Sequence, residues 1–258
     1  MSISFHSIVF GPIHSRRLGT SLGINLLPAY GKLCSFDCVY CECGWNKDGR
    51  TDTKLPSKEE IFKAIDDGLN ACLADGLQID TITFSGNGEP TLHPDFPEII
   101  DYVIESRGKY FPKAAISVLS NATFLNRKGV KEALAKIDNP ILKLDAADDR
   151  MARMIDRPQS PEYSVSRIVE NLKWFDGNFV LQTMFLRGNI EGESVDCTDP
   201  EAVSLWLRIV AELKPRQVMI YTLDRIPPLA TLEKVTVDEL NEIAAPVRDM
   251  GIDVVVAG

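Results

Sequence analysis

Three cysteines lie within eight residues, in the segment Cys34-Ser-Phe-Asp-Cys38-Val-Tyr40-Cys41. The spacing is C-x3-C-x2-C, and an aromatic residue directly precedes the third cysteine. Three thiolates on one short loop can hold a cubic iron–sulfur cluster and leave its fourth iron without a protein ligand. An open coordination position is where a metal site does chemistry. The spacing therefore predicts a cluster that binds a reactant.

Two other uses of these cysteines stay open on spacing alone. Cys34, Cys38, Cys41 and Cys43 could form a four-thiolate zinc site, and Cys38-Val-Tyr-Cys41 could be a redox dithiol. A zinc ribbon normally needs a second ligand pair, and the chain has no second C-x2-C. A dithiol would not need Cys34. The cluster is the favoured interpretation, and Cys43 is left as a bystander, a zinc ligand or a site of oxidation.

A glycine-rich segment, Phe84-Ser-Gly-Asn-Gly88-Glu89-Pro-Thr, follows an apolar run that is typical of a buried strand. Glycines at a strand end let a ligand approach the backbone closely. Glu89 can accept a hydrogen bond from an ammonium group. The alternative is a tight turn with an exposed acid.

Polar residues also follow the later expected strands. Asn121 can bind a carboxylate or a ribose hydroxyl, unless it only starts a turn. Asp145 can contact a ribose or a substrate, but Lys143 shares its face and could pair with it instead. Gln182 lies in an apolar strand and needs a partner when buried, from a ligand or from the protein. Thr222 ends the sixth strand, where the backbone could meet an adenine edge.

Four more residues are candidates for binding. Tyr40 could pack on adenine or in the core. Arg187 and Arg225 follow the fifth and sixth strands, and Arg16 belongs to the basic pair Arg16-Arg17 near the cysteine loop. Arginine suits carboxylate and phosphate, so these residues predict an anionic substrate group. For Arg16-Arg17, a solvated turn is the alternative.

Short apolar runs alternate with amphipathic stretches, as in successive βα units with a parallel sheet. The expected strands are one near 23–27 and those at 79–84, 114–119, 141–145, 179–186, 217–222 and 252–257. The expected helices are 57–73, 97–106, 127–136, 164–175 and two that begin after Asp199 and at Thr236. This is an α/β pattern of six βα units plus one strand. It predicts a partial (β/α)6 barrel, 1–258, with a short N-terminal extension, 1–20, and an extra C-terminal strand.

Composition narrows the class of protein. The 258 residues are 45% hydrophobic and 25% charged, which fits one α/β domain. No apolar run could span a membrane, and the N-terminus does not read as a secretory signal. Six cysteines, four of them crowded, suit a reducing cytoplasm better than a disulfide scaffold. A net charge of −9 disfavours nucleic acid as a partner.

The cysteine loop, followed one βα unit later by Gly88-Glu89-Pro90, resembles the radical S-adenosylmethionine (radical SAM) superfamily. Asn87 stands where the Gly-Gly-Glu motif of that superfamily has its first glycine. The segments Phe10-Gly-Pro-Ile-His-Ser-Arg-Arg and Gln182-Thr-Met-Phe-Leu-Arg-Gly extend the likeness over nearly the whole chain. They resemble an uncharacterised group of radical SAM Fe–S oxidoreductases that is related to wyosine-base tRNA enzymes.

The resemblance implies cofactors, residues and partners. Cys34, Cys38 and Cys41 would hold a [4Fe–4S] cluster, and Gly88 and Glu89 the amino end of S-adenosylmethionine. The implied remaining contacts to S-adenosylmethionine are Tyr40, Asn121, Asp145, Gln182 and Thr222. A flavodoxin- or ferredoxin-type reductant would supply the electron. No auxiliary cluster is expected, because no second cysteine group exists.

The fate of the radical stays open at this point. One route is hydrogen abstraction from a small molecule or a peptide. Modification of a tRNA base and activation of a glycyl-radical enzyme are two alternatives that use the same radical. A binding module that holds zinc or a cluster without catalysis is an alternative of another class.

Overall fold

An eight-stranded, open and curled sheet forms the centre of the molecule. The structure is a computed structural model that describes residues 5–15, 17–48, 54–225 and 227–258. The strand order is β1-β2-β3-β4-β5-β6-β9-β11; β1 pairs antiparallel with β2, and all other neighbours are parallel. Seven parallel strands with intervening helices confirm the partial (β/α)6 barrel with an extra C-terminal strand.

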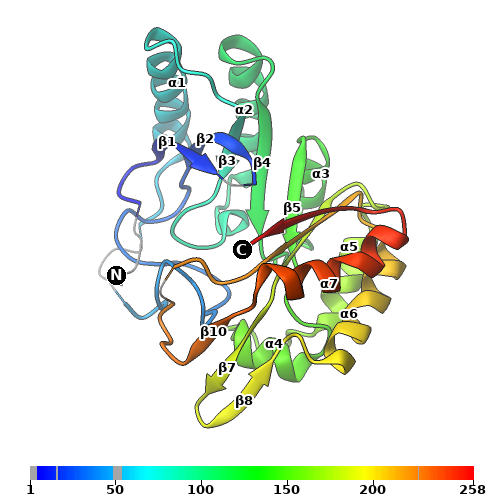
Figure 1. Cartoon of the computed structure of the whole chain (residues 1–258). Coiled ribbons are helices and arrows are strands. Elements are labelled where there is room, and N and C mark those ends of the chain that lie inside the picture. The colour runs from blue at the N-terminus through cyan, green and yellow to red at the C-terminus, as the bar shows by residue number, and fades with distance from the viewer. Residues whose placement is uncertain (1–4, 16, 49–53, 226) are drawn as a thin grey trace.

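The strands of this sheet are β1 Val9–Ser15, β2 Gly19–Ile24, β3 Thr81–Phe84, β4 Ala115–Ser120, β5 Asn139–Lys143, β6 Val180–Met184, β9 Gln217–Tyr221 and β11 Asp253–Ala257. The helices are α1 Lys58–Ala74, the 3-10 helix η1 Pro90–Leu92, α2 Phe96–Tyr110, α3 Val130–Ala135, α4 Asp149–Ile155, α5 Val165–Lys173, α6 Pro200–Leu213 and α7 Val237–Asp249. Capping boxes begin α1 at Ser57 and α7 at Thr236, as the sequence predicts. Figure 1 shows α5, α6 and α7 stacked along one side of the sheet.

Four parts of the fold differ from the expectation, and one of them is the helix α4, which was not among the expected helices. The first parallel strand is Gly19–Ile24, earlier than 23–27, because glycine and polar residues hide its pattern. Part of the N-terminal extension forms β1, which covers the edge of β2. A second sheet, β7 Leu186–Ile190, β8 Glu193–Asp196 and β10 Leu232–Lys234, was not predicted, since β7 follows β6 without a turn signal. Figure 1 shows the β7–β8 hairpin extending away from the main sheet.

Two separate clusters of apolar side chains cover the two faces of the curled sheet. Apolar residues such as Ile82, Ile116 and Leu142 are fully buried in the main hydrophobic core. A separate small cluster contains Ile141, Val180 and Met219, with three residues packed against it: Leu18, Leu119 and Val255. Because successive strand residues alternate between faces, this cluster is the apolar floor on the inner side of the sheet. In the described part of the chain, no helix is long and apolar enough to cross a membrane.

Candidate active site

The three cysteines of the C-x3-C-x2-C loop line one cavity of about 150 Å³. The cavity lies where the parallel strands end, which is where βα barrels carry their reactive groups. Its wall is formed by Lys32, Cys34, Phe36, Cys38, Tyr40, Cys41, Gly86, Gly88, Glu89, Leu119, Ser120, Asn121, Lys143 and Gln182. Five of the predicted S-adenosylmethionine contacts (Tyr40, Gly88, Glu89, Asn121 and Gln182) therefore share a cavity with the cysteines.

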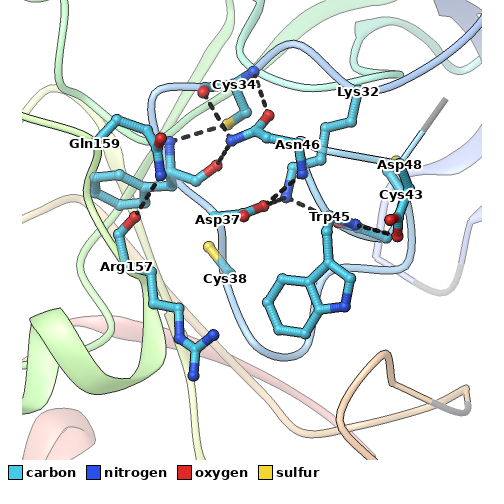
Figure 2. Close-up of polar contacts among 12 residues, drawn as sticks. Lys32, Cys34, Asp37, Cys38, Cys43, Trp45, Asn46, Asp48, Arg157 and Gln159 are labelled. Carbon is cyan, nitrogen blue, oxygen red and sulfur yellow. Dashed lines mark hydrogen bonds and ion pairs between the residues drawn. The ribbon is translucent and has the colours of Figure 1, made fainter. Parts of the chain in front are cut away.

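The cysteine loop is held by the side chain of Asn46 (Figure 2). Its Oδ1 accepts from the Cys34 N–H at 3.0 Å, and its Nδ2 donates to the Cys34 carbonyl at 3.1 Å. The Nδ2 also donates to the Phe36 carbonyl at 2.8 Å. Asn46 is 2% exposed, so a protein amide provides the hydrogen bonds that water would make to this loop. Sequence reasoning missed Asn46, because nothing in its spacing from the cysteines marks it.

Lys32 and Asp37 form a second brace across the same loop (Figure 2). The Lys32 Nζ lies 3.3 Å from the Asp37 Oδ1 and donates to the Gly44 carbonyl at 3.0 Å. Asp37 also accepts from the Asn46 N–H at 2.7 Å. Burial alone would lower the pKa of Lys32, but the cysteines and Asp37 raise it, so the lysine stays charged. Lys32 places a buried cation in the cavity wall beside the three thiols.

The cysteine thiols differ in acidity. Burial raises the pKa of Cys34 to about 12 and that of Cys38 well above its ordinary value. A hydrogen bond from Cys43 lowers the pKa of Cys41 to about 5, against the opposing effect of burial and with help from Lys32. Cys43 also donates to the Gly86 carbonyl at 3.2 Å. Cys43 thus supports a neighbouring thiolate, which is the form that ligates metals.

Gly88 brings the cysteine loop against the glycine-rich segment. Its φ is +134°, and a Cβ at this position would lie 1.9 Å from the Leu33 carbonyl oxygen. The Glu89 N–H donates to that carbonyl at 3.2 Å, and the Leu33 N–H donates to the Asn87 carbonyl at 2.8 Å. The sequence predicts a close approach here, but the structure shows that the approaching group includes protein backbone.

Glu89 is a buried carboxylate with both oxygens engaged. The Oε1 accepts from the Ser120 hydroxyl at 2.8 Å and the Thr91 N–H at 3.1 Å, and the Oε2 accepts from the Asn121 N–H at 2.7 Å. Burial raises its pKa, although these hydrogen bonds oppose the shift. The residue is 2% exposed, so it is a fixed acceptor in the wall of the cavity and not the exposed acid of the alternative interpretation.

Asn87, the departure from Gly-Gly-Glu, holds distant segments together. Its Nδ2 donates to the carbonyls of Pro28 and Phe5, both at 2.8 Å, and its Oδ1 accepts from the Phe5 N–H at 2.9 Å. The residue is 1% exposed. An asparagine therefore ties the segment before β1 to the glycine-rich segment, which a glycine could not do.

A buried ion-pair network lies at the end of β5. The Lys143 Nζ is 3.0 Å from the Asp145 Oδ2 and 2.8 Å from the Asp156 Oδ1, and it lies 3.2 Å from the Cys38 Sγ. The Tyr40 hydroxyl donates to Asp145. Burial raises the pKa of Asp145 to about 7, while Lys143 opposes the shift. The Lys143–Asp145 salt bridge, which was the alternative interpretation of Asp145, is present. Asp145 is next to the cavity because its partners Lys143 and Tyr40 both line the cavity wall.

Other predicted contacts lie away from the cavity wall. The Thr222 hydroxyl accepts from the Val235 N–H at 2.9 Å. Arg187 pairs with Glu239 at 2.7 Å on the small sheet, and Arg225 pairs with Glu42. Arg16 lies outside the described residues. None of Arg187, Arg225 and Thr222 lines the cysteine cavity. Arg225 nevertheless reaches the cysteine loop, because its partner Glu42 lies between Cys41 and Cys43.

Among the described residues, no three or more Cys, His, Asp or Glu side chains are gathered closely enough to hold a single metal ion. The three cysteines are instead distributed around the wall of a cavity. The thiolate ligands of a four-iron cluster bind different irons and need not converge on one point.

An open α/β half-barrel with a three-cysteine loop at the strand ends defines a class of protein. A sequence model of the Radical SAM superfamily matches residues 30–193, which is more than half of the chain. The chain belongs to the Radical SAM superfamily, whose members use a [4Fe–4S] cluster and S-adenosylmethionine. The family and both cofactors expected from the sequence are thereby confirmed.

Several relatives carry the name UPF0026 protein. One from Synechocystis sp. is 32% identical over 225 residues, which are 86% of this chain and 77% of the relative. One from Methanocaldococcus jannaschii is 29% identical over 244 residues, which are 93% of this chain and 70% of the relative. A Brachyspira hyodysenteriae protein named GTPase Obg is 31% identical over 220 residues, but this chain spans only 30% of its length.

Solved structures share the fold at low identity. Streptococcus suis SuiB bound to S-adenosylmethionine has a TM-score of 0.63 and 16% identity, over 88% of this chain and 49% of SuiB. TYW1 with a lysine-pyruvate adduct has a TM-score of 0.63 and 16% identity, over 90% of this chain and 75% of TYW1. These likenesses confirm the partial barrel, and the chain spans about half the length of SuiB.

Proposed function

We propose that the chain is a radical SAM enzyme that reductively cleaves S-adenosylmethionine and abstracts a hydrogen atom from a small-molecule or peptide substrate. One observation carries the proposal: the three cysteines and Gly88-Glu89 line the same cavity at the strand ends. Cluster and amino-acid ligand would thus be neighbours, as the reaction needs. The electron would come from an external flavodoxin- or ferredoxin-type reductant.

The donor set fits a [4Fe–4S] cluster held by Cys34, Cys38 and Cys41. Their loop is braced from within by Asn46 and Lys32. Bound there, the cluster would pass one electron to S-adenosylmethionine, whose C5'–S bond would break to give methionine and a 5'-deoxyadenosyl radical. Phe36 and Leu119 give the wall of this cavity an apolar part.

Glu89 would bind the amino group of S-adenosylmethionine. Four donors from Ser120, Asn121 and Thr91 fix its carboxylate, so it needs little reorganisation to accept from an ammonium. Asn121 donates to the Ser35 hydroxyl at 2.9 Å and would offer its amide to the neighbouring carboxylate. Gln182, also in the wall, would bind a nucleoside hydroxyl.

The substrate then loses a hydrogen atom. With both cofactors bound, a hydrogen atom of a substrate C–H bond would pass to the 5'-deoxyadenosyl group, which would leave 5'-deoxyadenosine and a substrate radical. The net charge of −9 disfavours a tRNA substrate. The fold-related SuiB has been solved with its precursor peptide SuiA, which is consistent with a peptide-sized ligand at such a sheet.

Anaerobic reconstitution tests the proposal. The protein is loaded with iron and sulfide, then given dithionite and S-adenosylmethionine, and 5'-deoxyadenosine is measured by chromatography. Wild type is expected to produce it, whereas Cys38→Ala should lose both the iron–sulfur absorption and the product. Cys72→Ala is the matched control, because Cys72 is buried on α1 and has no place in the cavity wall.

Two results would overturn the proposal. One is stoichiometric zinc with no cluster after reconstitution, which would support the binding module. The other is a loss of cluster absorption in Cys72→Ala with full absorption in Cys38→Ala, which would contradict the ligand assignment.

A further inference from the structure

We propose that Arg17 binds a carboxylate or phosphate group of the substrate on the inner side of the curled sheet. The inference rests on the proposed function, because it names the chemical class of that substrate. Three observations support the inference: Leu18 packs on the inner side of the sheet, Arg17 lies over Tyr221, and the Arg17 Nη1 is buried without a hydrogen-bond partner among the described residues.

Arg17 and Leu18, which precede β2, are hydrogen-bonded to the end of β1. The Ser15 hydroxyl accepts from the Arg17 N–H at 3.3 Å and from the Leu18 N–H at 3.2 Å. Gly19 has a φ of +75°, and a Cβ there would lie 2.5 Å from the Asp80 Oδ2. That carboxylate accepts from the Thr20 N–H at 2.8 Å. These contacts position Arg17 and Leu18 next to β2.

Leu18 lies on the inner side of the sheet. It packs against the apolar floor formed by Ile141, Val180 and Met219. Leu119 packs on the same floor and also lines the cysteine cavity. Leu18 and the cavity-lining Leu119 thus share one apolar cluster.

Arg17 lies over Tyr221 within this inner space. The Arg17 Cζ is 4.7 Å from the centre of the Tyr221 ring, a distance at which cation and ring attract each other. Tyr221 shares the inner face with Met219, two residues earlier on β9. The charged or titratable groups that act on Tyr221 are Asp145, Lys143, Arg17 and Cys38. Arg17 therefore shares a space with the ion-pair network of the cavity.

The Nη1 of Arg17 is buried and has no hydrogen-bond partner in the part of the chain that the structure describes. Among the described residues, no carboxylate lies within 4 Å of the Arg17 guanidinium. The two lysines of the cavity wall have acidic partners: Lys143 pairs with Asp145 and Asp156, and Lys32 pairs with Asp37. A buried donor without an acceptor destabilises the folded chain. Such a donor is expected where a ligand supplies the acceptor, and a guanidinium suits the paired oxygens of carboxylate and phosphate.

The anion is not the carboxylate of S-adenosylmethionine. Its amino and carboxylate groups share one carbon, so the carboxylate must lie beside Glu89 if Glu89 binds the amino group. Glu89 follows β3, whereas Arg17 lies over Tyr221 of β9, and β4, β5 and β6 separate these strands in the sheet. Arg17 is left for a second ligand, which is the substrate.

The test is a calorimetric titration of reconstituted protein that holds S-adenosylmethionine, with inorganic phosphate and with acetate as separate probes. Wild type is expected to bind one of them at one site per chain. Arg17→Gln should weaken that binding by about tenfold or more, the loss of a charge-assisted hydrogen bond, and Arg17→Lys should be intermediate. Arg150→Gln is the control, because Arg150 is exposed and pairs with Glu193.

Thermal unfolding separates a binding role from a structural one. Arg17→Gln removes an unpaired buried donor, so it is expected to unfold at or above the wild-type temperature, whereas loss of a structural arginine would lower it. Absence of anion binding by wild type, or equal binding by Arg17→Gln, would overturn the inference. A weakened affinity for S-adenosylmethionine in Arg17→Gln, measured by dialysis, would overturn it in favour of the cofactor carboxylate.

The inference and the proposed function fail in different ways. If wild type forms no 5'-deoxyadenosine yet binds the anion through Arg17, the proposed function is wrong and the anion site stands. If wild type and Arg17→Gln both form 5'-deoxyadenosine but bind the anion equally, the radical enzyme stands and the anion site is wrong.

Discussion

Asn46 and Cys34 exchange a pair of hydrogen bonds: the Asn46 amide accepts from the Cys34 N–H at 3.0 Å and donates to the Cys34 carbonyl at 3.1 Å. Both atoms of the amide are thereby committed to the backbone of the first cysteine. These two hydrogen bonds fix the start of the cysteine loop, although Cys34 lies twelve residues before Asn46 in the sequence. They also make the loop sensitive to a change of one atom.

Asn46→Asp is expected to reduce cluster incorporation. The substitution keeps the shape but turns a donor into an acceptor that faces the Cys34 and Phe36 carbonyls, at a cost of about 2 kcal/mol or more. Iron and sulfide content after reconstitution, with urea unfolding of the protein before reconstitution, measures the effect. Asn241→Asp is the control, since that asparagine lies on the exposed face of α7. Equal iron content in wild type and Asn46→Asp would contradict the brace.

Lys143→Met is expected to destabilise the chain by about 3–5 kcal/mol, the cost of breaking a buried pair from one side. Asp145 and Asp156 have side chains 0% and 3% exposed and would lose their shared cation. Urea unfolding at neutral pH measures the loss.

Lys136→Met is the control for Lys143→Met, because Lys136 and its partner Asp101 are both about half exposed. Exposed pairs contribute about 0–1 kcal/mol. Equal destabilisation by the two variants would show that the buried network adds nothing to stability.

Spacing and periodicity were sufficient for the barrel and for the cysteines. Cys34, Cys38 and Cys41 are close in sequence, and any fold of so short a loop brings them together. Gly88-Glu89 follows a strand with a clear apolar run, so its position at a strand end was also predictable. These are local signals, and the structure places both segments in one cavity wall.

The remaining residues of the site depend on contacts between distant segments. Lys143 meets Asp156 and Asn87 meets Phe5 only after the sheet has formed, and no spacing in the chain indicates either pair. The arginines illustrate the same limit. Their residue type suggested an anion, but Arg187 and Arg225 are paired with acids of this chain. Among the described residues, the Arg17 Nη1 and the Arg187 Nε are both buried without a hydrogen-bond partner.

Glu89→Gln is expected to weaken binding of S-adenosylmethionine by about tenfold or more, because a charged acceptor for the amino group is lost. A glutamine would also direct an amide N–H at one of the donors from Ser120, Thr91 and Asn121. Equilibrium dialysis of the reconstituted protein measures the affinity. Glu98→Gln is the control, since Glu98 is exposed and pairs with Lys58 on the surface. An unchanged affinity in Glu89→Gln would remove this residue from the cofactor site.

The pH dependence of stability tests the structural role of Arg187. Hydrogen bonds from Thr236, followed by that from Arg187, lower the pKa of Glu239 from its ordinary 4.5 to about 2. A depressed carboxylate pKa contributes stability that is present above pH 4.5 and is lost as the pH falls towards 2. Wild type should therefore exceed Glu239→Gln in urea midpoint at pH 6, and the difference should shrink between pH 4.5 and pH 2.5.

Arg187→Gln should reduce the same pH-dependent difference, because it removes one of the partners that stabilise the ionised Glu239. Glu242→Gln is the control, as Glu242 is exposed on the same helix. If Arg187→Gln left the urea midpoint unchanged at pH 6 and instead abolished binding of anions to the reconstituted protein, Arg187 would be the substrate residue that the sequence suggested. The ion pair with Glu239 at 2.7 Å favours the opposite result, in which Arg187 fastens the small sheet to the start of α7.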